Sequence, residues 1–132
     1  MSDMEKTMRH MEQRKKRYME RIKPHTKEEL KKLDVHLRSI WNSMRAALSK
    51  GDIELAVSYF CDRTKDGYRH NFKAMSPQML RRMAKDMGDI QLIKDNGFTI
   101  EYDIQITKGG KNFSFYLLFQ KDENEKWKID SF

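Results

Sequence analysis

Residues 98–119 constrain the fold of this chain more than any other stretch, because they form two alternating segments joined by Gly109-Gly110. From residue 98 to 107 an apolar residue alternates with a polar one, which is the period of a strand with one face in water. A two-glycine loop suits a tight hairpin turn, since the favoured turns need positive φ angles that glycine adopts freely. A turn there makes every cross-strand pair on one face apolar: Ile106–Phe113, Ile104–Phe115, Tyr102–Leu117 and Ile100–Phe119.

The same alternation predicts one further strand on each side of this hairpin. Asp95-Asn96-Gly97 and Asp122-Glu123-Asn124 each fit a three-residue loop, and the parity of both keeps the apolar residues on one face. The pairs predicted from these loops are Leu92–Ile100, Ile90–Tyr102, Trp127–Phe119 and Ile129–Leu117. The predicted sheet is therefore a four-stranded antiparallel meander of residues 89–94, 98–108, 111–121 and 125–131.

Helical periodicity occupies the residues before the sheet. Thr26-Lys27-Glu28-Glu29 fits a capping box, and Gly51 fits the left-handed residue that ends a helix. The apolar residues between them lie on one face of a long helix: Leu30, Leu33, Leu37, Ile40, Trp41, Met44 and Leu48. Shorter helices are predicted after Asp52, over residues 65–75, and from Ser76-Pro77 to Gly88. Helices first and strands last predict an α+β fold with the helices covering one face of the sheet.

Residues 1–25 form a basic arm ahead of a domain at residues 26–132. Residues 1–24 hold eight Lys or Arg and four Asp or Glu, a net +4 out of +7 for the whole chain. Apolar residues at spacings near three and four predict an amphipathic, methionine-rich helix in this arm. The predicted partner-binding residues of the arm are Met8, Met11, Arg14, Lys15, Lys16, Arg17 and Tyr18.

Several partners fit such an arm. Its apolar stripe can pack on its own domain, on a second copy or on another protein, which makes a protein partner the leading expectation. Nucleic acid or an anionic membrane surface would suit the basic run instead. We favour nucleic acid less, because Tyr18 is alone in the arm as an aromatic residue that bases stack on.

Composition excludes several other classes. The longest apolar run, Phe113 to Phe119, is interrupted by Ser114, so no membrane span is predicted. The first residues have no apolar core of a signal peptide, which favours a cytoplasmic protein, or an exported one if a leader has been removed. The single cysteine, Cys61, allows neither an internal disulfide nor a cysteine-based zinc site. The four histidines have no metal-binding spacing, so we predict no metal and no cofactor.

Several short motifs of the chain resemble a known superfamily. They are Trp41 to Leu48, Lys50 to Ala56 with Tyr59-Phe60, and the closing Lys126-Trp127-Lys128-Ile129. Together they resemble small bacterial domains of the nuclear-transport-factor-2-like, or cystatin-like, superfamily over roughly residues 35–132. The resemblance implies a cone, in which a curved sheet wraps a long helix and leaves a pocket at its open end. Members of the superfamily include isomerases, dehydratases and protein-binding transport factors.

The predicted register bears on whether the cone holds a catalytic site. Enzymes that this chain resembles use a carboxylate or histidine inside the cone, but Glu101 and Asp103 fall on the outer face of the sheet. The residues predicted to line a pocket are His36, Trp41, Tyr59, Tyr102, Ile104, Phe115 and Leu117. No catalytic residue is predicted among them.

These observations favour a non-catalytic binding or scaffold domain, which holds a protein partner, itself or a small apolar ligand. An isomerase or dehydratase with a pocket in the cone is the alternative. A nucleic-acid-associated protein acting through the arm is the second alternative. The outer face of the sheet also carries two large apolar residues, Tyr116 and Leu118, which predict a homodimer packed sheet to sheet.

Overall fold

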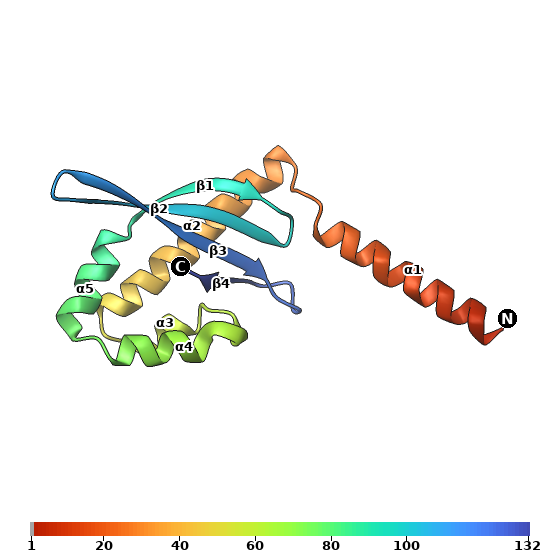
Figure 1. Cartoon of the computed structure of the whole chain (residues 1–132), viewed down its shortest axis with the longest axis horizontal. Coiled ribbons are helices and arrows are strands. Elements are labelled where there is room, and N and C mark those ends of the chain that lie inside the picture. The colour runs from red at the N-terminus through yellow and green to blue at the C-terminus, as the bar shows by residue number, and fades with distance from the viewer. Residues whose placement is uncertain (1) are drawn as a thin grey trace.

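The computed structural model describes residues 2–132, without the side chains of residues 17–21. Its elements are α1 (Asp3–Arg21), α2 (Lys27–Ser49), α3 (Ile53–Val57), α4 (Asp62–Lys73), α5 (Pro77–Asp86), β1 (Asp89–Asp95), β2 (Thr99–Lys108), β3 (Lys111–Lys121) and β4 (Trp127–Ser131). Helices come first and strands last, so the predicted α+β fold is confirmed (Figure 1). The long helix α2 lies against the sheet, and α1 projects away from the rest of the molecule (Figure 1).

The sheet is an open antiparallel meander in the order β1-β2-β3-β4. Its central hairpin has the predicted register, since Ile106 pairs with Phe113 and Ile104 with Phe115. Gly109 and Gly110 have φ angles of 58° and 76°, the positive values that the two-residue turn requires.

The predicted register between β1 and β2 is wrong by two residues. Leu92 pairs with Tyr102 rather than with Ile100, and Ile90 pairs with Ile104. The turn lies later in the chain than expected, because the Asn96 N–H donates to the Thr99 carbonyl at 2.9 Å and only Gly97 and Phe98 lie between them. A bulge between Leu92 and Lys94 then adds one residue to β1 and returns its apolar side chains to the core face.

The predicted register between β3 and β4 is also wrong by two residues. Ile129 pairs with Phe119, and Trp127 pairs with Lys121. The loop lies one position later than expected, because the Asp122 N–H donates to the Lys126 carbonyl at 2.8 Å. A shift of two keeps the same side chains on the same face, so Ile129 remains buried.

The predicted caps of α2, α3 and α5 are present. The Thr26 hydroxyl accepts from the Glu29 N–H at 3.2 Å, and the Glu29 carboxylate accepts from the Thr26 N–H at 2.9 Å. Asp52 caps α3 through the Leu55 N–H, and Ser76 caps α5 through the Met79 N–H. These side chains satisfy backbone groups that a helix start leaves without partners.

The third predicted helix begins earlier than expected, at Asp62 instead of residue 65, and ends at Lys73. The Cys61 carbonyl accepts from the N–H groups of Thr64 and Lys65, which starts the helix without a side-chain cap. The Cys61 N–H donates to the Ile129 carbonyl at 2.8 Å. The segment before α4 is therefore held by β4, which no local sequence pattern indicates.

The core lies between α2 and the inner face of the sheet. Trp41 is completely buried, and its indole N–H donates to the Met87 carbonyl at 2.8 Å. The Arg45 guanidinium donates to the Ala84 carbonyl and lies against Gly88, where an added Cβ would approach it to 2.7 Å. These contacts hold α5 and the start of β1 against the second half of α2.

The inner and outer faces of the sheet differ in their tolerance of charge. We expect Ile104→Asp to unfold the domain, because Ile104 is 1% exposed and an unpaired buried carboxylate costs several of the roughly 5–15 kcal/mol that stabilise a domain. Asp103→Ala, at the neighbouring position on the outer face, should change the free energy of unfolding by less than about 0.5 kcal/mol. Thermal melts of the two variants check this, and similar melting temperatures would contradict it.

Candidate functional site

The predicted interior pocket is filled by packed side chains. Trp41, Tyr102, Ile104 and Leu117 are all buried in the core. Tyr102 stacks edge to face on Phe119 with 5.4 Å between ring centroids. Among the described residues, no buried side-chain nitrogen or oxygen lacks a hydrogen-bond partner. The centre of the domain is therefore a satisfied core.

The other three predicted pocket residues lie elsewhere. His36 is exposed on α2, and Tyr59 is half-buried, with its carbonyl accepting from the Ile129 N–H at 2.8 Å. Phe115 is 51% exposed on β3. The structure thus does not bring the seven residues together, and Ile104 and Phe115 are the two that share one cavity.

That cavity is a groove of about 450 Å³ between α5 and the far half of the β2–β3 hairpin. Four methionines lie along it: Met75, Met79, Met83 and Met87. Its other apolar residues are Ile104, Ile106, Phe115 and Phe132. We call this cavity the methionine groove.

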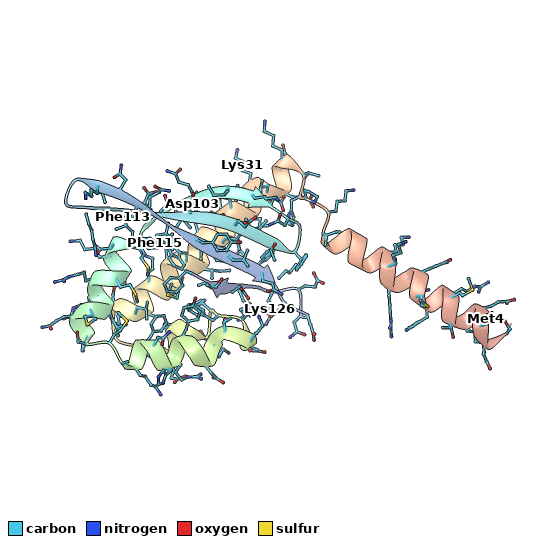
Figure 2. The ribbon with its side chains drawn as sticks, in the orientation of Figure 1. Met4, Lys31, Asp103, Phe113, Phe115 and Lys126 are labelled. Atoms are coloured by element: carbon cyan, nitrogen blue, oxygen red, sulfur yellow. The ribbon has the colours of Figure 1, made fainter. Side chains whose placement is uncertain are left out.

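The groove forms where the turn end of the hairpin extends past the helices that cover the rest of it (Figure 1). Beyond Ile104 the strands extend past the core, and Phe113 and Phe115 are both about half exposed. Figure 2 shows these two side chains on the part of the hairpin nearest its turn. The apolar face that the sequence predicted is therefore buried at one end and open at the other.

The rim of the methionine groove is polar and mainly basic. Lys108 on β2 and Asp86 on α5 form an ion pair of 3.5 Å, which joins the two walls of the groove. Arg82 also lies at the rim and forms no ion pair with any described residue. The groove therefore offers an apolar floor with an available positive charge beside it.

The methionines of this groove are partly visible in the sequence pattern. Its pattern predicts Met75, Met79, Met83 and Met87 as inward residues of a packed core. Met79 is instead 54% exposed and lines the open groove. Ten methionines in one chain are the sequence feature that points to an adaptable apolar site.

A second polar cluster joins α2 to β2. The Tyr102 hydroxyl donates to the Asp34 carboxylate at 2.5 Å, and the Arg38 guanidinium donates to the same carboxylate at 3.0 Å. Burial, and then the negative charge of Asp34, raise the pKa of the Tyr102 phenol far above its ordinary value. The cluster keeps Tyr102 neutral and fixes its ring in the core. Sequence reasoning did not single out Asp34, because its partner lies 68 residues away.

The predicted oligomer face is exposed to solvent. Tyr116 is about half exposed, and its hydroxyl donates to Glu101 at 3.0 Å. Leu118 is half-buried on the same face. A homodimer formed through these residues stays a prediction.

The described arm residues are presented to solvent along α1. Met8, Met11, Arg14, Lys15 and Lys16 are all exposed, whereas the side chains of Arg17 and Tyr18 lie outside the described part of the structure.

His25 anchors the base of the arm. Its N–H donates to the Asp95 carboxylate at 2.6 Å, and its ring lies 3.0 Å from the other oxygen. These bonds tie the segment between α1 and α2 to the end of β1.

Comparisons of this chain with known protein families, curated proteins and solved structures find no match. No helix in the described part of the chain is both long and apolar enough to cross a membrane. Among the side chains that the structure describes, no three His, Cys, Asp or Glu gather in a way that would hold a metal ion. The local geometry of the methionine groove is therefore the basis for a functional conclusion.

Cys61 should be a slow nucleophile in the folded protein. Burial, and then the nearby Asp130 carboxylate, raise the pKa of its thiol from 9.0 to about 11. Because the thiolate is the reactive form, we expect iodoacetamide to label the native protein slowly at about pH 8 and faster as the pH approaches 11. Protein unfolded in guanidinium provides the control, and equal rates for folded and unfolded protein would contradict the expectation.

Proposed function

We propose that this protein is a non-catalytic binding or scaffold domain whose methionine groove holds the apolar face of a partner. The observation that carries the proposal is an open apolar groove of about 450 Å³ on a domain whose interior is filled. An apolar surface of this kind is costly to leave in water unless something covers it.

The residues of the groove suit the face of a helix. Methionine side chains are flexible and polarisable, so they adapt to irregular apolar surfaces. α5 has ten residues and is therefore about 15 Å long, enough to accept roughly three turns of a helix laid beside it. Phe115 on the opposite wall supplies a rigid aromatic surface against which such a helix would pack.

The rim indicates the charge of the partner. Arg82 and Lys108 line the groove, and the charge of Lys108 is offset by Asp86. A partner whose apolar stripe is flanked by carboxylates would pair with Arg82. We therefore propose a partner of amphipathic, acidic character for this site.

This function is compatible with the resemblance of the chain to the nuclear-transport-factor-2-like superfamily, which includes protein-binding members. One long helix against an antiparallel sheet, with shorter helices beside it, supports that resemblance. We prefer binding to the isomerase alternative, because Trp41 and Tyr102, which were predicted to line a central pocket, are buried in the core.

An anionic apolar dye tests the groove directly. We expect full-length protein at about 1 µM to enhance the fluorescence of 1-anilino-8-naphthalenesulfonate, since the dye combines an apolar body with a negative charge. Phe115→Glu should reduce this enhancement at least about 5-fold by placing a carboxylate on the apolar wall. Met79→Glu should act in the same direction from α5.

Matched controls lie beside each of these positions. Ser114→Glu adds the same charge to the outer face of β3, and Gln78→Glu adds it to α5 away from the groove. Both controls should bind the dye as the unchanged protein does. Equal loss in the control and the groove variants, or no binding by the unchanged protein, would overturn the proposed function.

A further inference from the structure

We propose that the methionine groove of one copy receives helix α1 of a second copy, so that two copies exchange their arms in a dimer. This inference rests on the proposed function, because it names the partner of the same groove. The observations that carry it are the exposed methionine stripe of α1, the charges beside that stripe, and the direction in which the arm leaves the domain.

The stripe of α1 matches the groove in chemistry. Met4, Met8 and Met11 are 74%, 56% and 62% exposed, and their spacing places them on one side of the helix. A helix of 19 residues is only marginally stable in water unless something covers its apolar side. The chain therefore carries two exposed apolar surfaces, a methionine stripe and a methionine groove.

One edge of the stripe carries the charge opposite to that of the groove. At 100° per residue, Glu5 and Glu12 lie beside the stripe, whereas Lys6 and Arg9 lie toward the back of α1. Residues 2–13 hold three acidic and two basic residues, a net −1, although the whole arm is basic. Helix α5 holds Arg81, Arg82, Lys85 and Asp86, a net +2. The acidic flank of the stripe can thus approach Arg82.

The dimensions also agree. Met4 to Met11 spans eight residues, or about 10 Å of helix between the first and the last, against about 15 Å for α5. The basic run that begins at Arg14 follows the stripe, so it would leave the groove toward solvent. The proposed contact therefore uses the first half of α1.

The arm leaves the domain at the end opposite to the groove, so it does not fill the groove of its own chain. In Figure 1, α1 extends from one end of the molecule, whereas α5 and the turn of the β2–β3 hairpin lie at the other. The two bonds between His25 and Asp95 hold the base of the arm in this direction. The groove of a second copy can receive α1 instead. If each copy places its α1 in the groove of the other, the dimer is closed by two identical contacts.

Sedimentation equilibrium of full-length variants tests the exchange. We expect the unchanged protein to be dimeric at about 100 µM and Met8→Glu to weaken the dimer at least about 10-fold, because two buried methionines are lost per dimer. Gln13→Glu adds the same charge on the opposite side of α1 and should leave the dimer intact. Phe115→Glu should weaken the dimer as Met8→Glu does, while Ser114→Glu should not. A monomeric unchanged protein at this concentration would overturn the proposal.

Mixing two variants shows whether arm and groove contact each other. Met8→Glu keeps an intact groove, and Phe115→Glu keeps an intact arm, so a mixture of the two contains one complete contact per mixed dimer. We expect the mixture to regain dimer mass that neither variant shows alone. A mixture that remains monomeric would contradict the exchange, even if both variants fold with unchanged circular dichroism.

Dye binding separates this inference from the proposed function. If arms fill the grooves, dye bound per chain should fall as the unchanged protein is concentrated from about 1 to 100 µM, and Met8→Glu should bind equally throughout. If dye binding is constant and the protein is monomeric, the arm is not the partner but the groove still binds apolar ligands. If no variant binds the dye in the groove, the proposed function itself fails.

Discussion

The apolar face of the β2–β3 hairpin is the constraint on which the rest of this structure depends. Its cross-strand pairs bring Ile100, Tyr102 and Ile104 to one side, and α2 must cover them. Trp41 fixes that cover, because its indole N–H reaches the Met87 carbonyl and so positions α5 and β1. The core, the placement of the helices and the groove all follow from a hairpin whose turn end extends past the helices that cover it.

The covered part and the open part of this apolar face have different roles. Near Tyr102 the face is covered by α2, and the Tyr102 hydroxyl donates a hydrogen bond to Asp34. Toward Phe113 and Phe115 the same face is open, and α5 approaches it from one side with methionines. Stability and recognition therefore use adjacent parts of the same hairpin, which is why a charged residue has such different effects at Ile104 and at Phe115.

The arm adds a second element that needs a cover. Its stripe of methionines faces solvent, and its base is held by His25 against Asp95, far from α5. The molecule has an exposed apolar helix at one end and an exposed apolar groove at the other. Association between two copies can cover both surfaces. This physical complementarity connects the basic arm to the domain, although the two are separate in the sequence.

The local sequence was sufficient for the features that depend on near neighbours. The Gly109-Gly110 turn, the central register and the Thr26 cap require residues only a few positions apart, and all were predicted correctly. The registers of β1 and β4 were not. In β1 a later turn at Gly97-Phe98 combined with a bulge beside Leu92, and in β4 a loop closed by Asp122, moved the pairing by two residues. The methionine groove was decided only by the tertiary structure. Periodicity marks a side chain as apolar, but the relative lengths and positions of packed elements determine whether Met79 and Phe115 are covered.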